Sequence, residues 1–115
     1  NYSMQKNSLN KVLLIGRLGA SPEARYTSAG VPVVSFSLAT NEFWKQKDGK
    51  QVERVEWHNI VIWDRLAEVA QNSLSKGQLI SIEGKLQTRS WENKEGQKMK
   101  TTEIVCSNFI LLERK

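Results

Sequence analysis

The sequence has little cysteine and little histidine, and these scarcities exclude two classes of protein. Cys106 and His58 are the single residues of their kinds among 115. One thiol cannot form an intramolecular disulfide, so a disulfide-stabilised exported domain is excluded. No group of residues has the spacing of metal ligands, and we expect neither a metal ion nor a cofactor. We interpret Cys106 as a small buried or interfacial hydrophobe.

Long apolar runs and catalytic motifs are also missing. No run approaches the roughly 18 residues of a membrane span. The first ten residues, "NYSMQKNSLN", have no signal-peptide core; we expect Met4 to be the natural first residue and residues 1–3 to be left from cloning. The sequence has no Gly-rich phosphate loop, and no Ser–His–Asp, Cys–His or paired-carboxylate arrangement can be argued. We therefore predict a binding protein and not an enzyme.

What the sequence does have is positive charge and tryptophan. The net charge is +5 and the pI is about 9.5, which favours an anionic partner. Four of the nine aromatic residues are tryptophan, which is more indole than a core of this size needs. The length fits one domain with one core.

Periodicity predicts five strands and one helix. Strands are expected in 11–18, with Gly16 at a bulge or bend, in 31–40, and in a third run that ends at 55–63. Asp48-Gly49 predicts the hairpin between the second and third strands, and the segment 21–30 is interpreted as a turn. In 64–77, apolar residues at helical spacing predict a helix, with Asp64 as N-cap, Lys76 in the last turn and Gly77 as the stop. The fourth strand is expected in 78–91, and the turn 93–96 leads to the fifth.

The third strand, "VEWHNIVIW", is apolar on both faces. Alternation places Trp57 and Trp63 on one face, and His58 with two isoleucines on the other. One face suffices for the core. The second face is interpreted as a surface for a ligand, or alternatively as a second packed layer such as a subunit interface.

The fourth strand repeats this pattern. Ile80, Ile82 and Leu86 share a predicted core face, with Gly84 allowing a bend. The other face carries Lys85, Gln87, Arg89 and Trp91. A solvated face would explain the cations but not the indole, whereas cations alternating with aromatics suit a polyanion whose bases can stack.

A fourth indole, Trp44, stands beside Lys45 and Lys47 where the second strand enters its hairpin. Strict alternation would place it with the core residues of that strand. A structural tryptophan at a strand end is therefore the alternative to a ligand contact.

Five strands with a helix after the third is the order of the OB-fold, so we predict an all-β, five-stranded Greek-key barrel with one helix between strands three and four. The motifs "NKVLLIGRLGASPEARYT", "SFSLATNEFW", "EWHNIVIWDRLAEVA", "LSKGQLISIEGKLQTRSW" and "TTEIV" carry a closer likeness. Over residues 9–112 the sequence resembles the bacterial and mitochondrial single-stranded DNA-binding protein family.

The resemblance implies roles for particular residues. It implies base stacking for four aromatic positions and phosphate contacts for several basic positions. Trp63 stands where members of the family commonly have Phe. Asn59 stands where the family often has arginine. The implied stacking residues are Trp44, Trp57, Trp63 and Trp91; the phosphate contacts are Lys11, Lys45, Lys76, Lys85 and Arg89, with Lys47 added for its place beside Trp44.

The resemblance also implies an assembly and a setting. We expect residues 10–112 to form the DNA-binding domain after an extension at 1–9, and four copies to form a homotetramer with His58 near a subunit contact. Residues 113–115 close the sequence without the acidic tip through which bacterial members recruit replication and repair proteins. We expect a bacterial cytoplasmic location, at the nucleoid, with mitochondrion and plastid as alternatives.

The predicted function is sequence-independent binding and protection of single-stranded DNA in replication, recombination and repair. The alternatives are an RNA-binding, cold-shock-like or primosome-accessory OB domain, and a scaffold whose second apolar face is a protein interface.

Overall fold

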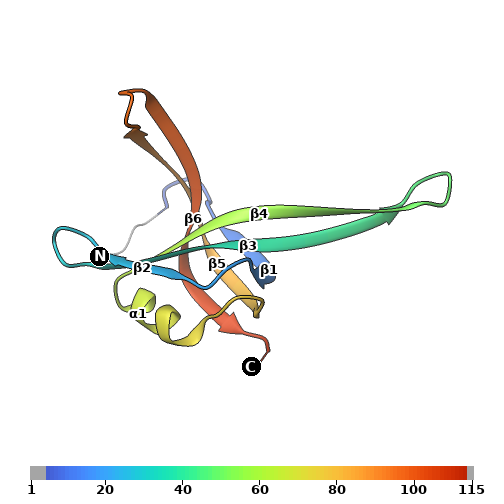
Figure 1. Cartoon of the computed structure of the whole chain (residues 1–115), viewed down its shortest axis with the longest axis horizontal. Coiled ribbons are helices and arrows are strands. Elements are labelled where there is room, and N and C mark those ends of the chain that lie inside the picture. The colour runs from blue at the N-terminus through green and yellow to red at the C-terminus, as the bar shows by residue number, and fades with distance from the viewer. Residues whose placement is uncertain (1–4, 114–115) are drawn as a thin grey trace.

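The computed structural model describes residues 5–113, which form one barrel with two long hairpins (Figure 1). The elements in chain order are β1 (Val12–Leu18), β2 (Glu23–Tyr26), β3 (Pro32–Lys45), β4 (Gln51–Trp63), α1 (Asp64–Ser73), β5 (Leu79–Glu92) and β6 (Lys98–Leu111). The predicted all-β OB-fold is confirmed, with its helix between β4 and β5. The five expected strands are β1, β3, β4, β5 and β6.

The sheet closes because β1 contacts strands on both of its edges. The strand order is β1-β5-β6-β4-β3-β2, and β1 also pairs with β3 at Arg17 and Leu18. All pairings are antiparallel except that of β4 with β6, which aligns Ile60 with Ile104. Gly16 makes the closure possible without a bulge, since a Cβ there would lie 2.2 Å from the carbonyl oxygen of Ala39.

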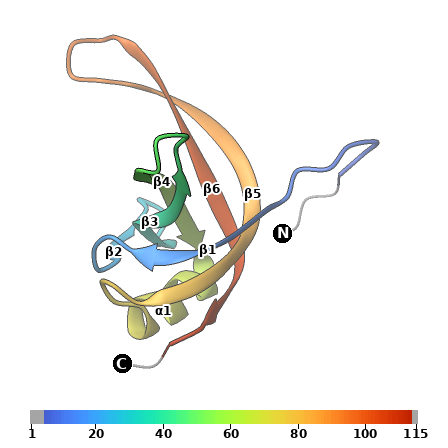
Figure 2. The same cartoon turned by 90° about the vertical axis from the view of Figure 1, so that its right-hand side faces the viewer.

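The core lies inside the barrel and against α1. Ile60 and Ile62 of β4 and Ile80 and Ile82 of β5 are at most 1% exposed, as alternation predicts. Figure 2 shows α1 below the barrel, where Ala67 and Ala70 are fully buried. Their small side chains let the helix backbone lie close to the strands.

The helix begins and ends differently from the prediction. It starts at Asp64 itself, Trp63 occupies the N-cap position, and no side chain caps it, so Asp64 is not the N-cap. It ends at Ser73, before Lys76 and Gly77, because Leu74 adopts an extended conformation. Gly77 instead turns the chain into β5 with φ +84°, and its N–H donates to the carbonyl oxygen of Leu18.

The segment 21–30 contains a short strand, β2, that was predicted as turn. All four residues of β2 are exposed, so no apolar alternation marks it. Backbone pairing with β3 forms it as a strand, from Glu23 opposite Ser35 to Tyr26 opposite Pro32.

The outer halves of two hairpins leave the barrel as arms (Figure 1). The β3–β4 arm pairs without interruption out to Lys45 opposite Gln51, and the β5–β6 arm out to Glu92 opposite Lys98. Leu86 was predicted in the core, but it lies beyond Gly84 at the base of the β5–β6 arm and is 51% exposed. The side chains of β5 still alternate between faces there, but the strand has left the barrel, so the core does not cover Leu86.

Candidate nucleic-acid interface

A groove runs between the outer face of β3–β4 and the β5–β6 arm. Ser37 of β3 and Asn59 and Val61 of β4 line one side, and Arg89, Thr101 and Glu103 of the arm line the other. Its volume is about 310 Å³, and it is open to solvent. We call it the arm groove.

Trp57 and Trp63 lie on the same face of β4 as Asn59 and Val61, because every second side chain of a strand projects to the same side. Their exposed fractions are 56% and 40%. The benzene ring of Trp57 fits against Gly19, where an added Cβ would come within 2.5 Å of it. Gly19 thus holds the indole beside the strand while its surface stays open to solvent.

Arg89 is held at the groove by an acid from the neighbouring strand. Its Nε donates to Oε1 of Glu103 at 3.1 Å. Glu103 is only 7% exposed, whereas half of the Arg89 side chain remains accessible. The buried carboxylate is therefore neutralised, and the guanidinium is fixed with part of its surface free for an anion.

Trp91 is fixed in a similar way. Its Nε1–H donates to Oγ1 of Thr101 at 2.8 Å, a diagonal contact across β5 and β6. The ring is 40% exposed. With its one polar hydrogen already used inside the arm, the indole offers an outside ligand its π surface.

Trp44 lies on the opposite face of the β3–β4 ribbon from Trp57. It pairs with Val52 and shares its face with Thr40 and His58. The indole is 45% exposed, so alternation does not bury it out on the arm. His58 is half-buried, and its Nε2 lies 3.0 Å from Oγ1 of Thr40.

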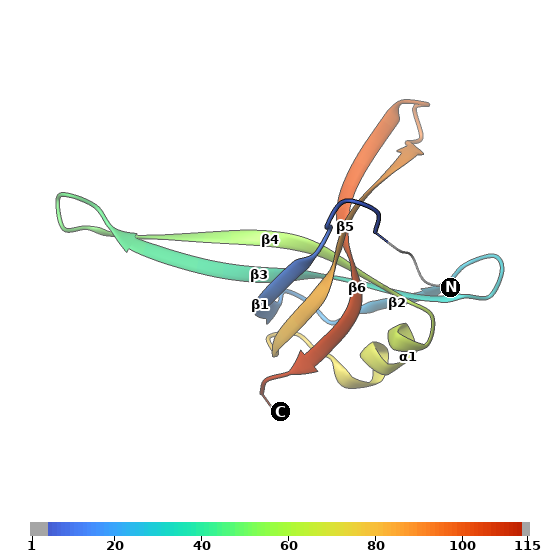
Figure 3. The ribbon, with the colours of Figure 1, turned by 180° about the vertical axis from the view of Figure 1, so that it is seen from behind.

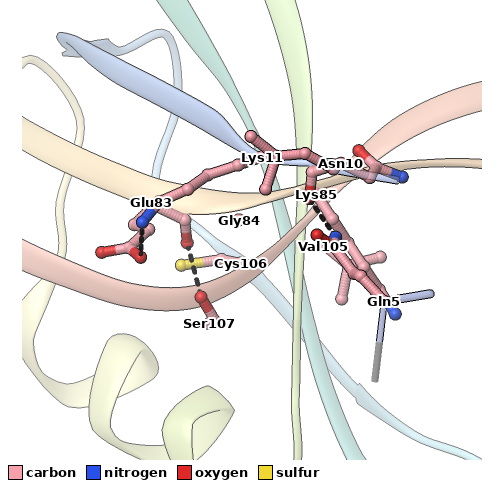
Figure 4. A pocket seen from close by; sticks show the side chains of 10 residues that line it. Gln5, Asn10, Lys11, Glu83, Gly84, Lys85, Val105, Cys106 and Ser107 are labelled. Atoms are coloured by element: carbon pink, nitrogen blue, oxygen red, sulfur yellow. Dashed lines mark hydrogen bonds and ion pairs between the residues drawn. The ribbon is translucent and has the colours of Figure 1, made fainter. Parts of the chain in front are cut away.

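Two of the predicted phosphate contacts line a different cavity, of about 790 Å³, at the base of β5 (Figure 4). Lys11 contacts Glu83 there through an ion pair of 3.1 Å, and Lys85 lies on the same wall. The wall also holds Cys106, whose burial raises the pKa of its thiol to about 11. At neutral pH this cysteine is protonated and unreactive.

The other predicted cations are spread over the surface. Lys45 ends β3 at the far end of its arm, and Lys47 lies in the turn that follows. Lys76 lies in the turn between α1 and β5. The structure thus places Arg89 in the arm groove, Trp57 on the β4 face that lines it and Trp91 farther out on the β5–β6 arm. Trp63 lies at the barrel end of the same β4 face, opposite Val33, and the remaining predicted residues flank this surface at several distances.

A profile described as "Single-strand binding protein family" matches residues 9–112 of this chain. The chain belongs to the single-strand binding protein family. Among curated relatives, "Single-stranded DNA-binding protein 1" of Chlorobaculum tepidum is 52% identical over 108 residues, covering 93% of this chain and 67% of the relative. The "Single-stranded DNA-binding protein" of Neisseria meningitidis is 47% identical over 105 residues, covering 91% of this chain and 60% of its own length.

Solved structures with the same fold include members of the family. A Plasmodium falciparum SSB in complex with ssDNA has a TM-score of 0.82 and 36% identity, covering 96% of this chain and all of that one. A deletion mutant of the single-stranded DNA binding protein from Thermus aquaticus has a TM-score of 0.78 and 34% identity, covering 91% of this chain and 51% of that one. The chain spans about three-fifths to two-thirds of the length of the two curated relatives named above.

Four residues of this family member's candidate interface were not predicted: Gly19, Thr101 and Glu103 beside predicted residues, and Phe43 on the β3–β4 arm. Gly19, Thr101 and Glu103 contact a predicted residue from another strand, so they are visible only once the strand register is known. Phe43 could have been found from the sequence: it precedes Trp44 in "NEFW", so strand alternation places it on the opposite face from Trp44, the face of Trp57.

Within residues 5–113, no three His, Cys, Asp or Glu side chains gather as a metal site, and no helix is long and apolar enough to cross a membrane.

Proposed function

We propose that this chain binds single-stranded DNA without regard to sequence. The observation that carries the proposal is the exposure of all four indoles, between 40% and 56%. Trp44 and Trp91 lie on arms that also carry lysine and arginine, and Trp57 and Trp63 lie on the outer face of β4. None of these rings belongs to the barrel core, and their open faces can stack on unpaired bases while the cations contact phosphates. Membership of the family and the ssDNA complex of the Plasmodium relative support this assignment.

The chemistry of the surface explains why binding would be blind to sequence. Every base has a π-face and every nucleotide a phosphate. Reading a base edge needs hydrogen-bonding groups aimed at it, but the Trp91 N–H and the Arg89 Nε are bound to Thr101 and Glu103. Duplex DNA is expected to bind far more weakly, because its bases are already stacked and paired.

The role that follows is protection of unwound DNA in replication, recombination and repair, without catalysis. The names of the bacterial relatives support single-stranded DNA binding, the activity from which this role follows. The location that we propose is the bacterial cytoplasm, with mitochondrion and plastid as alternatives. An RNA-binding OB domain remains the second candidate from the sequence, and competition between DNA and RNA oligomers of equal length separates the two.

The test is a titration of tryptophan fluorescence with oligo-dT. We expect quenching on binding, because the bases would stack on the exposed rings. Trp44→Ala and Trp91→Ala should each weaken binding by about 1–3 kcal/mol, a range taken from single-strand binding OB-folds themselves. Both variants should fold, since both rings are exposed. A parent protein whose fluorescence ignored oligo-dT would instead support the scaffold alternative.

We also propose that the protein assembles as a homotetramer with dihedral symmetry. Figure 3 shows β1, β5 and β6 side by side, and their outer surface carries Leu13, Ile15 and Ile110, which are 69%, 62% and 54% exposed. Such a patch on a small soluble domain marks an interface. Light scattering should give four times the chain mass, and Ile15→Asp should lower it; a parent that stays monomeric at micromolar concentration would contradict the proposal.

A further inference from the structure

Phe43 lies on the same face of the β3–β4 ribbon as Trp57 and Trp63. The register pairs Trp57 with Ala39 and Phe43 with Glu53, so all four side chains project to one side of the ribbon. Val55 lies between them on this face, opposite Asn41. Trp57, Val55 and Phe43 therefore form one apolar stripe that starts beside the arm groove and follows the β3–β4 arm outward.

The fold does not account for this stripe. Phe43 is 66% exposed and Val55 40%, and neither belongs to the core. The part of the arm that carries them projects beyond the barrel, where no second layer within residues 5–113 covers it (Figure 3). An exposed phenylalanine on a two-stranded ribbon contributes little to stability and indicates contact with something outside the chain.

The stripe continues the proposed stacking surface at a useful spacing. Four residue pairs separate the Trp57 level from the Phe43 level, which is roughly 13 Å at about 3.3 Å per residue. Lys45 follows Phe43 on the same face, and Lys47 and Lys50 lie in or beside the turn at the end of the arm. Two acids accompany these three lysines, Glu53 opposite Phe43 and Asp48 in the turn, so the cations are in slight excess here.

We infer that Phe43 is a further base-stacking residue, which extends the single-stranded DNA path from Trp57 along the outer face of the β3–β4 arm. The inference rests on the proposed function. Trp44, the next residue, projects to the opposite face. A strand that rounds the edge of the arm would therefore meet one ring on each side.

Single-stranded DNA is favoured over a protein partner for two reasons. The stripe is continuous with the arm groove through Trp57, and it ends among lysines rather than in a closed apolar patch. A second copy of this chain would carry the same positive charge at the same place, which disfavours contact between two arm ends.

The test compares variants at one position. Phe43→Ala should weaken oligo-dT binding about fivefold, the lower end of the range for one base–aromatic contact, a range taken from proteins of this family. Phe43→Leu keeps apolar bulk without a ring and should lose as much, whereas Phe43→Tyr should bind like the parent. Ultraviolet cross-linking of oligo-dT followed by mass spectrometry should recover the peptide that contains Phe43.

Trp57→Ala separates this inference from the proposed function. If Trp57→Ala weakens binding and Phe43→Ala does not, the path does not reach the arm, and only the inference is overturned. If both variants bind like the parent, the proposed stacking surface and its extension both fail. Full affinity of Phe43→Leu, or a lower mass of Phe43→Ala in light scattering with unchanged binding, would assign the ring to apolar packing or to a subunit contact and overturn the inference.

Discussion

At the scale of single residues, the β5–β6 arm presents side chains of β5 that are oriented by side chains of β6. Thr101 accepts the hydrogen bond of the Trp91 indole, and Glu103 fixes Arg89. Thr101→Val keeps the shape and the strand preference but removes the acceptor. Because one such hydrogen bond contributes about 0.5–1.5 kcal/mol, we expect oligo-dT binding to weaken by a factor of about two to ten, measured by fluorescence titration.

Thr102→Val is the matched control. Its hydroxyl contacts Thr88 at 3.1 Å on the other face of the same arm, so its loss should leave affinity unchanged. Thr101→Ser, which restores an acceptor, should recover most of the binding. Equal losses in Thr101→Val and Thr102→Val would mean that the hydroxyls only support the ribbon.

The sequence predicted the burial of individual residues well where the pattern within a single strand was enough to assign a side chain to a face. Alternation alone separated the buried Ile60 and Ile62 from the exposed Trp57 and Trp63. It could not predict Glu103 or Thr101, because their contacts depend on which residue of β5 lies opposite each residue of β6. A register is set by the whole hairpin and by the irregularity at Glu83/Gly84, which no local pattern specifies.

At the scale of elements, three hairpins close with the same turn. In each, a glycine with positive φ stands fourth of five residues, and its N–H donates to the carbonyl oxygen of the first; these glycines are Gly30, Gly49 and Gly96. The sequence predicted the last two from Asp-Gly and "NKEG". It did not predict the strand before Gly30, since the exposed β2 has no apolar face to reveal it.

Gly84 allows β5 and β6 to approach closely at the point where the β5–β6 arm leaves the barrel. An added Cβ would lie 2.3 Å from the carbonyl oxygen of Val105, where the pairing of the two strands shifts. Gly84→Ala must push the strands apart, and we expect it to lower the free energy of unfolding by about 1–3 kcal/mol in urea denaturation. Ser90→Ala, an exposed change farther along β5, should stay within about 0.5 kcal/mol. Parental stability of Gly84→Ala would show that the arm base adapts freely.

At the scale of the whole molecule, two arms extend a domain that measures 55 × 38 × 37 Å. One barrel alone offers a short path for a nucleic acid. The arms add surface without adding core, and the net charge of +5 is carried partly by their lysines and arginine. The sequence predicted this charge and these indoles but not their distribution, because the predicted cation row of β5 divides: Lys85 lines the cavity of Lys11, whereas Arg89 lines the arm groove.

Because Lys85 and Arg89 line different cavities, the salt dependence of binding tests whether the single-stranded DNA contacts both of them. Each phosphate neutralised releases counterions, so log K should fall with log salt by about 0.7 per contact for a single strand. Replacing Lys85 and Arg89 together with Ala should flatten the slope by roughly one to one and a half, equally for oligo-dT and for a mixed-sequence strand. Arg89→Ala alone should give about half of that change.

Lys98 and Lys100 provide the matched control for this measurement. They lie on the same arm but pair with Glu92 and Ser90, so they project to the face away from Arg89 and Trp91. Replacing both with Ala removes the same charge, yet it should change the slope far less, because no phosphate is expected on that face. If the two double variants flattened the slope equally, binding would follow the net charge of the arm and not a path through the groove. An unchanged slope for the Lys85 and Arg89 variant would assign both residues to the solvated surface.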